Sequence, residues 1–318
     1  MTNNEGKIKI AAIVGPTASG KTSLSVSVAK ALGGEIVCCD SMQIYRDMNI
    51  GTAAPTPEET AGVPHHLFGF LDPKTAFSCS DYAAAADAAI ADIASRGKLP
   101  ILVGGTGLYL DSVLLGCGDA SAEPDEAFRR EMNEFYEKNG ALALHSRLRE
   151  LDPEAAEAIH PNNVKRVIRA LEICRAYGSK TEYDKAARKG MRYDASVVCL
   201  GYTDRSILYR RIESRVDAMI DAGLLEETRR LMSEGVFEAN ATAAQAIGYK
   251  ELLPYIRGEE ELSTSVERLK TATRHYAKRQ LTWFSAKDYV TNIAVDGIEN
   301  KKTFEEIVNN IIKLFNLL

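Results

Sequence analysis

Short apolar segments alternate with amphipathic ones along the first third of the chain. Three apolar or β-branched runs, Ile8–Val14, Glu35–Cys39 and Leu99–Val103, each end at a glycine or a polar residue, as buried strands do. Between them, apolar residues recur at helical spacing over Lys21–Leu32 and over Ser80–Ser95. Because strands that alternate with helices form parallel sheets, the pattern predicts an α/β fold with a parallel-sheet core.

The pattern changes after Gly118. Residues 124–192 have helical spacing throughout, many charges and no strand-like run, and Ser196–Leu200 then returns to a strand-like sequence. Helical spacing resumes over 206–286, and the chain closes with a predicted strand and a predicted helix. We therefore predict an all-helical domain, residues 118–195, inserted into a core formed by residues 1–117 and 196–318.

Composition places the chain among ordinary globular proteins. It has 318 residues, of which 45% are hydrophobic and 26% charged, enough to bury a large core without disulfide staples. No run approaches the roughly 20 apolar residues that a membrane span needs, and the polar start lacks a signal-peptide pattern. The six cysteines are scattered without a CxxC pair, which disfavours a zinc site and indicates free thiols in a reducing cytoplasm.

A phosphate-binding loop is predicted at residues 15–22, which match the pattern GxxxxGK[ST] between a predicted strand and a predicted helix. Its glycines let backbone N–H groups turn toward phosphate oxygens, and the helix N-terminus adds a partial positive charge. Lys21 offers a cation, and the hydroxyl of Thr22 can hold Mg²⁺. The pattern does not identify the phosphorylated molecule and leaves open whether ATP binds. The loop consists of Gly15, Pro16, Thr17, Ala18, Ser19, Gly20, Lys21 and Thr22.

An acid is missing where nucleotide hydrolases usually hold magnesium. The run Leu99–Val103 is followed by two glycines and Thr106 rather than by an aspartate. The nearest acid at a strand end is Asp40, directly after Glu35–Cys39. Because ligands of open α/β folds bind at this edge of the sheet, Asp40 is a candidate site residue. The alternative is a cap for the turn that follows.

Several short motifs occur in an order that is specific in combination, although each is weak alone. In chain order they are GPTASGKT at 15–22, DSMQIY at 40–45, GTAAP at 51–55, VPHH at 63–66, VGGTGLY at 103–109, Arg166 with RALE at 169–172, AIGYKE at 246–251 and AKRQLTWF at 277–284. Over about residues 10–284 the chain resembles the tRNA dimethylallyltransferase (isopentenyl-tRNA transferase) family, in its bacterial form without a C-terminal zinc finger.

The resemblance implies prenyl transfer to RNA. The family moves a dimethylallyl group from dimethylallyl diphosphate to the exocyclic amino group of the adenine on the 3′ side of the anticodon in tRNA, and diphosphate is released. The loop would then hold the donor, with Mg²⁺ supporting the diphosphate. Asp40 matches the family's catalytic acid and is the expected base, because an adenine amino group is a poor nucleophile. Thr106 is expected to donate a hydrogen bond to the leaving group, with a plain turn residue as the alternative.

Four arginines lie near the start of one predicted helix: Arg205, Arg210, Arg211 and Arg215. Arg211 and Arg215 share a face by their i,i+4 spacing. We assign Arg215 to the diphosphate site, but the sequence leaves open which of the four makes the contact, since a solvated helix face explains any one of them. His65 and His66 are expected to be structural. Ala53 departs from the family, in which lysine is frequent, and this argues against a charged role there.

Basic residues gather in two segments although the formal net charge of the chain is −5. Between His160 and Asp194 nine lysines and arginines face four acids, and between Val266 and Asp288 six face two. Such asymmetry is typical of a nucleic-acid surface, with solvated helix faces as the alternative. The resemblance implies tRNA contacts at Asp40, Ser41, Met42, Gln43, Arg166, Arg169, Lys278, Arg279, Gln280, Thr282 and Trp283, with plain core as the alternative for Trp283. We add three expected contacts that do not come from the resemblance: Thr106, Lys165 in the basic segment, and Arg129 on the inserted helices.

We therefore predict an enzyme whose inserted helices grip the anticodon stem-loop and whose pocket receives an adenine turned out of its stack. Its expected partners are tRNA and dimethylallyl diphosphate, and we expect a monomer in the cytoplasm with no membrane association. Three rivals remain: a prenyltransferase for free adenine nucleotide, a kinase that uses the loop for ATP, and an RNA-binding protein with a vestigial loop. The basic insertion argues against the first, and intact Lys21 and Thr22 argue against the last.

Overall fold

The computed structural model of the chain describes residues 6–116, 125–187, 190–240 and 242–316. These residues divide into two compact units. The first unit comprises Met1–Leu114 together with Tyr193–Leu318, and the second comprises Leu115–Arg192. The second unit is thus one continuous segment between two parts of the first, whereas the insertion predicted from the sequence comprises residues 118–195.

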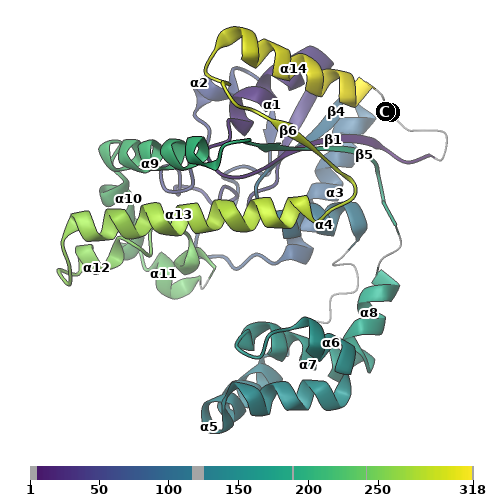
Figure 1. Ribbon diagram of the computed structural model, residues 1–318, viewed down its shortest axis with the longest axis vertical. Coiled ribbons are helices and arrows are strands. Elements are labelled where there is room, and N and C mark those ends of the chain that lie inside the picture. Colours follow the sequence, from purple (N-terminus) through teal and green to yellow (C-terminus); the bar gives the residue numbers. More distant parts are fainter. Residues whose placement is uncertain (1–5, 117–124, 188–189, 241, 317–318) are drawn as a thin grey trace. The chain divides into compact units, whose positions relative to one another are not determined.

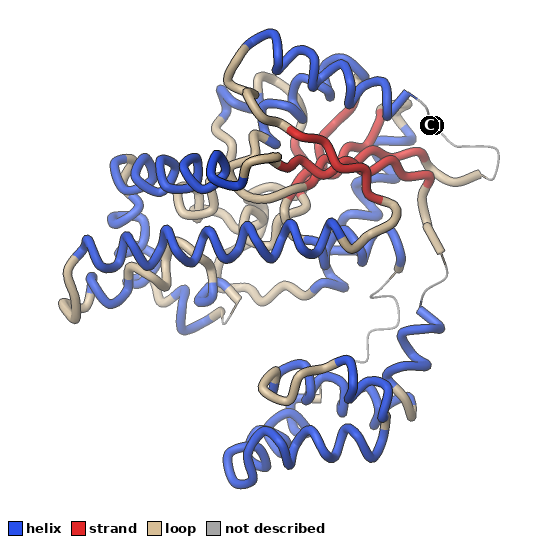
Figure 2. The backbone as a smooth tube through the Cα atoms, viewed as in Figure 1, coloured by secondary structure: helices blue, strands red, loops and turns tan. Residues whose placement is uncertain are grey.

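A parallel sheet forms the centre of the first unit (Figures 1 and 2). Its strands are β1 (Lys9–Val14), β2 (Gly34–Cys38), β3 (His65–His66), β4 (Leu99–Gly104), β5 (Asp194–Gly201) and β6 (Val290–Ala294). All six are parallel, in the spatial order β3-β2-β4-β1-β5-β6, so the predicted α/β class is confirmed. Ile13 in the middle of the sheet lies beside Val103 of β4 and Val198 of β5. The carboxyl ends of β1, β2 and β4 therefore meet at one edge.

Helices cover both faces of this sheet, which is why its strands are continuous apolar runs. On one side lie α1 (Lys21–Leu32) and α14 (Lys301–Asn316), with α3 (Cys79–Ser95) and α4 (Gly107–Leu115) on the other (Figure 1). Leu24 and Ile311 from the first pair of helices share a buried cluster with Ile13 and Ile101 of the sheet. This core fixes the strand ends from which the site residues project.

A second group of helices follows β5. It consists of α9 (Arg205–Asp221), α10 (Leu224–Ser233), α11 (Val236–Ala239), the 3₁₀ turn Ala243–Gln245, α12 (Leu253–Ile256) and α13 (Leu262–Ser285), with the short α2 (Pro57–Thr60) elsewhere in the unit. Gly223 and Gly235 divide the predicted helical stretch, because each adopts a left-handed conformation before the next helix. Tyr45 and Met48, from the segment after β2, are buried among these helices with Tyr249.

The second unit is helical, with α5 (Glu126–Leu151), α6 (Pro153–Ala158), α7 (Val164–Tyr177) and α8 (Lys180–Ala187). Its own core includes Leu144, Leu148 and Leu171. Within α5 the helical geometry breaks at Gly140, where φ is 81°. Over the residues that the structure describes, no helix of either unit is long and apolar enough to cross a membrane.

Candidate active site at the carboxyl edge of the sheet

The phosphate loop joins β1 to α1 at this edge. Gly15 has φ of 142°, and a side chain there would come within 2.7 Å of the Leu200 carbonyl oxygen, so the loop passes closely over the end of β5. Ala18 and Gly20 also adopt positive φ, which turns the chain into the start of α1. The Ser19 hydroxyl is buried and has no hydrogen-bond partner among the described residues. A buried orphan hydroxyl suits a loop built to bind phosphate oxygens.

Lys21 curls back over the loop. Its Nζ donates hydrogen bonds to the carbonyl oxygens of Gly15, at 3.0 Å, and Pro16, at 2.7 Å. Burial, followed by the charge of Arg215, lowers the pKa of Lys21 to about 8, although the nearby negative charge of Asp40 opposes the shift. The charge of Arg215 thus disfavours the charged form of Lys21, and that of Asp40 favours it.

Two arginines of α9 reach the loop. Arg215 Nη1 donates to the Thr17 hydroxyl at 3.2 Å, and Arg211 Nε donates to the Ala18 carbonyl oxygen at 2.9 Å. Burial lowers the pKa of Arg215. Arg211 is also paired with Glu299, whereas Arg215 has no ion-pair partner in the part of the chain that is described. Of the two, Arg215 is therefore the cation with charge left to offer a diphosphate.

Asp40 follows β2 at the same edge and is half-buried. Its Oδ1 accepts hydrogen bonds from the backbone N–H groups of Met42, at 2.9 Å, and Gln43, at 3.4 Å. Its Oδ2 accepts none from another described residue. The carboxylate therefore does cap the following turn, as the alternative interpretation expects, but with one oxygen only. The second oxygen is free to accept a proton.

Thr106 ties the turn after β4 to the Asp40 segment. Its Oγ1 accepts from the Ser41 backbone N–H at 3.0 Å and lies 3.3 Å from the Ser41 hydroxyl, and its own N–H donates to the Cys39 carbonyl at 3.2 Å. The turn fits tightly, because a methyl group on Gly104 would lie 1.9 Å from the Cys39 carbonyl oxygen. Asp40 and Thr106, both expected in catalysis, are thus held side by side.

Helix α13 faces this edge with Gln280 and Trp283. Gln280 is buried, and its amide accepts from the Thr17 N–H at 2.9 Å and donates to the Gly105 carbonyl at 3.0 Å. Trp283 packs on Gly107, where a methyl group would lie 2.2 Å from the indole. Both side chains therefore join α13 to the loop and to the turn after β4. Their expected contact with tRNA stays a prediction.

Tyr276 belongs to this cluster although the sequence analysis did not single it out. Burial, then the charge of Asp40, raises the pKa of its hydroxyl, while a hydrogen bond with the Thr106 side chain acts in the opposite direction. The guanidinium of Arg279 lies 5.6 Å from the centre of its ring. The signal that could have found Tyr276 is its i,i+4 spacing from Gln280, which puts both on one face of α13.

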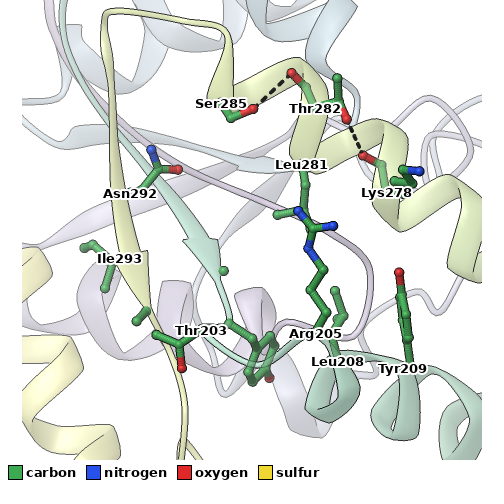
Figure 3. A pocket seen from close by; sticks show the side chains of 13 residues that line it. Thr203, Arg205, Leu208, Tyr209, Lys278, Leu281, Thr282, Ser285, Asn292 and Ile293 are labelled. Carbon is green, nitrogen blue, oxygen red and sulfur yellow. Dashed lines mark hydrogen bonds between the residues drawn. The ribbon is translucent and has the colours of Figure 1, made fainter.

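Lys278 and Thr282 lie elsewhere, beside a groove of about 440 Å³ between α9, α13 and the ends of β5 and β6 (Figure 3). Figure 3 shows the Arg205 side chain reaching from α9 toward α13, next to Tyr209. Neither Arg205 nor Lys278 has an ion-pair partner within the described ranges. Among the predicted RNA contacts of α13, Gln280 thus contacts the phosphate loop and Trp283 packs after β4, whereas Lys278 and Thr282 line the groove.

The basic residues expected on the insertion differ in their exposure and in their ion pairs. Lys165 and Arg166 are exposed in the first turn of α7. Arg129 and Arg169 both pair with the buried Glu172. Burial alone raises the pKa of Glu172, but the hydrogen bonds from these arginines and from a backbone N–H outweigh it and lower the pKa. The two guanidiniums are therefore fixed in place. Two further basic residues, at 188 and 189, lie outside the described residues.

The histidine pair is engaged in structural contacts. His66 Nε2 lies 2.7 Å from a carboxylate oxygen of the buried Glu35, and His65 Nδ1 lies 2.8 Å from the Val63 carbonyl oxygen. No group of three or more histidine, cysteine, aspartate or glutamate side chains is placed to hold a metal ion in the described portion of the chain. An oxygen for a hard cation is available at Thr22, whose hydroxyl makes no hydrogen bond to any other described residue.

The fold belongs to the phosphate-loop α/β class, and the comparisons with known proteins place the chain among transferases. Family models agree: residues 43–287 match IPP transferase, and residues 8–68 match isopentenyl transferase. The chain belongs to the IPP transferase family, which contains the tRNA dimethylallyltransferases.

Individual relatives cover almost the whole chain. The tRNA dimethylallyltransferase of Bacillus subtilis is 49% identical over 91% of this chain and 91% of its own, and that of Caldanaerobacter subterraneus is 45% identical over 96% and 97%. The crystal structure of the full-length tRNA isopentenylpyrophosphate transferase from Bacillus halodurans has a TM-score of 0.72 at 44% identity, covering 98% of this chain and 97% of that one. A eukaryotic dimethylallyltransferase solved acting on tRNA has a TM-score of 0.80 at 29% identity, covering 96% and 80%.

Proposed function

We propose that this chain transfers the dimethylallyl group of dimethylallyl diphosphate to the exocyclic amino group of the adenine on the 3′ side of the anticodon in tRNA. The observation that carries the proposal is that cationic side chains and a carboxylate lie at the same edge of the sheet. Lys21 and Arg215 present positive charge at the phosphate loop, and Asp40 keeps an unbonded carboxylate oxygen next to Thr106. Membership of the family selects the donor and the acceptor.

The donor's diphosphate would lie in the phosphate loop. Backbone N–H groups at the start of α1 and the buried Ser19 hydroxyl would donate hydrogen bonds to its phosphate oxygens. Lys21 and Arg215 would neutralise the charge that grows on the diphosphate as the allylic carbon–oxygen bond breaks. Mg²⁺, which diphosphates commonly bind, would take the Thr22 hydroxyl as a ligand and stabilise the leaving group further.

The acceptor needs a base. As the adenine nitrogen bonds to the allylic carbon, its lone pair leaves the ring system and the nitrogen must lose a proton. The Oδ2 atom of Asp40 would take that proton while the bond between the allylic carbon and the diphosphate oxygen breaks. The products are prenylated RNA, a protonated Asp40 and diphosphate. Thr106 would orient the Asp40 segment and donate to the leaving group.

RNA would be held by cations outside the chemical centre. Adenine in a stacked anticodon loop is shielded, so the base has to turn out of the stack to reach Asp40. The exposed Lys165 and Arg166 of α7 and the fixed Arg129 and Arg169 supply positive charge for the RNA backbone. The set proposed to contact tRNA remains Asp40, Ser41, Met42, Gln43, Thr106, Arg129, Lys165, Arg166, Arg169, Lys278, Arg279, Gln280, Thr282 and Trp283.

We further propose that the protein acts as a monomer in the cytoplasm. All proposed donor-site groups come from a single chain, and the described cysteines Cys38, Cys39, Cys79, Cys174 and Cys199 are free thiols, which suits a reducing compartment. Light scattering of the protein with and without tRNA measures the assembly state. A mass of two chains in the active complex would contradict the monomer.

The deciding experiment is mass analysis of tRNA nucleosides after incubation with dimethylallyl diphosphate and Mg²⁺. The expected product is adenosine enlarged by one dimethylallyl group at the position 3′ of the anticodon. A parallel reaction with AMP as acceptor tests the free-nucleotide rival, and one with ATP and no prenyl donor tests the kinase rival. Efficient prenylation of AMP, or phosphate transfer without RNA prenylation, would overturn the proposal.

A further inference from the structure

The backbone turn at 49–51, downstream of Asp40, is held by one carboxylate from α10. The Glu227 side chain accepts hydrogen bonds from three consecutive backbone N–H groups, those of Asn49 at 3.1 Å, Ile50 at 3.0 Å and Gly51 at 2.9 Å. Its Oε1 also accepts from the Tyr249 hydroxyl at 2.8 Å. Three successive amides bound by one carboxylate fix both the position and the orientation of the turn.

The same turn is confined by packing. A methyl group on Gly51 would lie 2.4 Å from the Tyr249 ring, so the backbone packs directly against the hydroxyl-bearing end of that side chain. Asp47 and Ala53, on either side of the turn, have φ of 62° and 51°, in the left-handed region that non-glycine residues adopt infrequently. The Arg230 guanidinium donates to the Asp47 carbonyl at 2.5 Å. Helix α10 and Tyr249 therefore impose the shape of residues 47–53.

Hydrogen bonds continue from this turn to the candidate base. The side-chain amide of Gln43 donates to the carbonyl oxygens of Thr52 and Ala53, both at 3.0 Å. The backbone N–H of the same residue, with that of Met42, donates to Asp40 Oδ1. A connected set of contacts thus leads from Glu227, through the turn and Gln43, to the Asp40 carboxylate.

We propose that Glu227 is a positioning residue for Asp40. The inference rests on the proposed prenyl transfer, in which Asp40 takes the proton of the acceptor amine. Without the carboxylate of Glu227, the amides at 49–51 lose their common acceptor and the carbonyls that hold Gln43 shift. The Asp40 carboxylate would then be displaced from the position in which it abstracts the proton. A displacement of about 1 Å can lower the rate on the order of 100-fold. Substrate binding at the phosphate loop would be unchanged.

The test compares three full-length variants in single-turnover prenylation of tRNA. Glu227→Gln keeps the size of the side chain but loses the charge and one acceptor. Tyr249→Phe removes a single hydrogen bond to Glu227 and keeps the ring that packs on Gly51. The matched control is Glu226→Gln, the adjacent residue on α10, which pairs with the exposed Arg229 and with no other residue that the structure describes. All are checked for folding by thermal unfolding.

We expect Glu227→Gln to lower the rate constant of the chemical step at least about tenfold, with Tyr249→Phe intermediate and the control within about twofold of wild type. The dissociation constant of the donor should stay within about twofold. An unchanged rate constant in Glu227→Gln, or a weakened donor affinity that accounts for the whole loss, would overturn the proposal. If Glu227→Gln does not fold, Tyr249→Phe decides: an unchanged rate constant contradicts the proposal.

A double-mutant cycle separates positioning from general destabilisation. If Glu227 acts through Asp40, then Glu227→Gln should have no further effect in an Asp40→Asn background. If it acts by loosening the fold, the same loss should appear in both backgrounds, which would refute the inference. The cycle also separates this inference from the function on which it rests. Wild-type turnover in Asp40→Asn alone would contradict the proposed base, whereas a slow Asp40→Asn with a fully active Glu227→Gln contradicts only the positioning role.

Discussion

The charge of Lys21 titrates within reach of physiological pH, and this has a measurable consequence. Its folded-state pKa is lowered to about 8, first by burial and then by Arg215, so the side chain is charged below that pH and neutral above it. A neutral amine does not attract diphosphate. We therefore expect kcat/KM for the donor, at saturating tRNA, to fall as pH rises through about 8, by about tenfold per unit above it.

The control for this pH profile is Lys21→Arg. A guanidinium stays charged at all accessible pH values, so the alkaline decline should disappear even if the absolute rate is lower. Lys21→Ala should weaken donor binding at every pH. A wild-type profile that is flat between about pH 7 and 9.5 would contradict the assigned role of this ammonium.

Asp40 offers a second prediction at this scale. Asp40→Ala removes the proton acceptor, and a general base typically contributes about 10²- to 10⁴-fold, so turnover should fall to near background. Affinity for tRNA should change by no more than a few-fold, because the basic residues of α7 are untouched. Single-turnover kinetics and equilibrium tRNA binding measure the two quantities separately. Wild-type turnover in this variant would remove Asp40 from the mechanism.

The sequence predicts where the candidate site residues lie along the fold better than it predicts the side chains that contact them. The phosphate loop and Asp40 could be predicted because each follows a strand directly, so local pattern fixes their place. The choice between Arg211 and Arg215 could not, because it depends on how α9 packs on the loop. Tyr276 was not predicted as part of the site for the same reason, since the residues around it come from segments far away in the chain.

At the scale of elements, Asp152 holds three helices of the second unit together. It caps α6 by accepting from the Ala155 N–H at 2.9 Å, and it accepts from the Ser179 hydroxyl and the Thr181 N–H, each at 2.8 Å, at the start of α8. Burial alone would raise the pKa of Asp152, but these hydrogen bonds outweigh it and lower the pKa. One buried carboxylate thus organises the joints between α5, α6 and α8.

We expect Asp152→Ala to destabilise the second unit by about 2–4 kcal/mol, because a cap is lost and several donors are left without an acceptor. Hydrogen exchange of the α6 and α8 amides measures this locally. The contribution should be present above the ordinary carboxyl pKa of 3.8 and should be lost as pH falls below it. The control is Glu154→Gln on the same helix, an exposed partner of Lys185, which should cost less than about 0.5 kcal/mol. Equal effects of the two changes would argue against the role of Asp152.

Element boundaries followed from sequence only where the pattern was long. Helix α1 and the central strands were predicted within a residue or so, since burial on both faces leaves continuous apolar runs. The two-residue β3 was missed, because His65 and His66 carry no strand pattern and pair with Ile36 and Val37 only through the folded sheet. The stretch over 206–286 was one helical signal, and only its left-handed glycines showed where it divides.

At the scale of the whole molecule, the distribution of charge determines which segments can bind RNA. With a formal net charge of −5, the chain as a whole repels RNA, so binding depends on local basic segments. We expect the affinity for tRNA to fall steeply with added salt, because each phosphate contact releases counterions. Replacing both Lys165 and Arg166 with alanine should flatten the slope of log K against log salt by about 1 to 2.

The matched control replaces Lys301 and Lys302, two strongly exposed lysines of α14 in the first unit. This pair changes net charge equally but lies outside the proposed RNA surface, so the slope should stay the same. Filter binding or fluorescence titration from about 50 to 300 mM salt measures both variants. A wild-type affinity that is independent of salt over that range would contradict an electrostatic grip on RNA.

The close packing around the end of β4 also limits which residues can replace Gly104 and Gly107. At Gly104 the obstacle is the backbone of Cys39, which cannot be exchanged, so saturation mutagenesis should recover glycine alone among active clones. At Gly107 the obstacle is the Trp283 ring, which can be exchanged. A directed-evolution library that varies both positions should therefore recover larger residues at 107 only in clones that carry a smaller residue at 283, a linked pair of changes between segments distant in the chain.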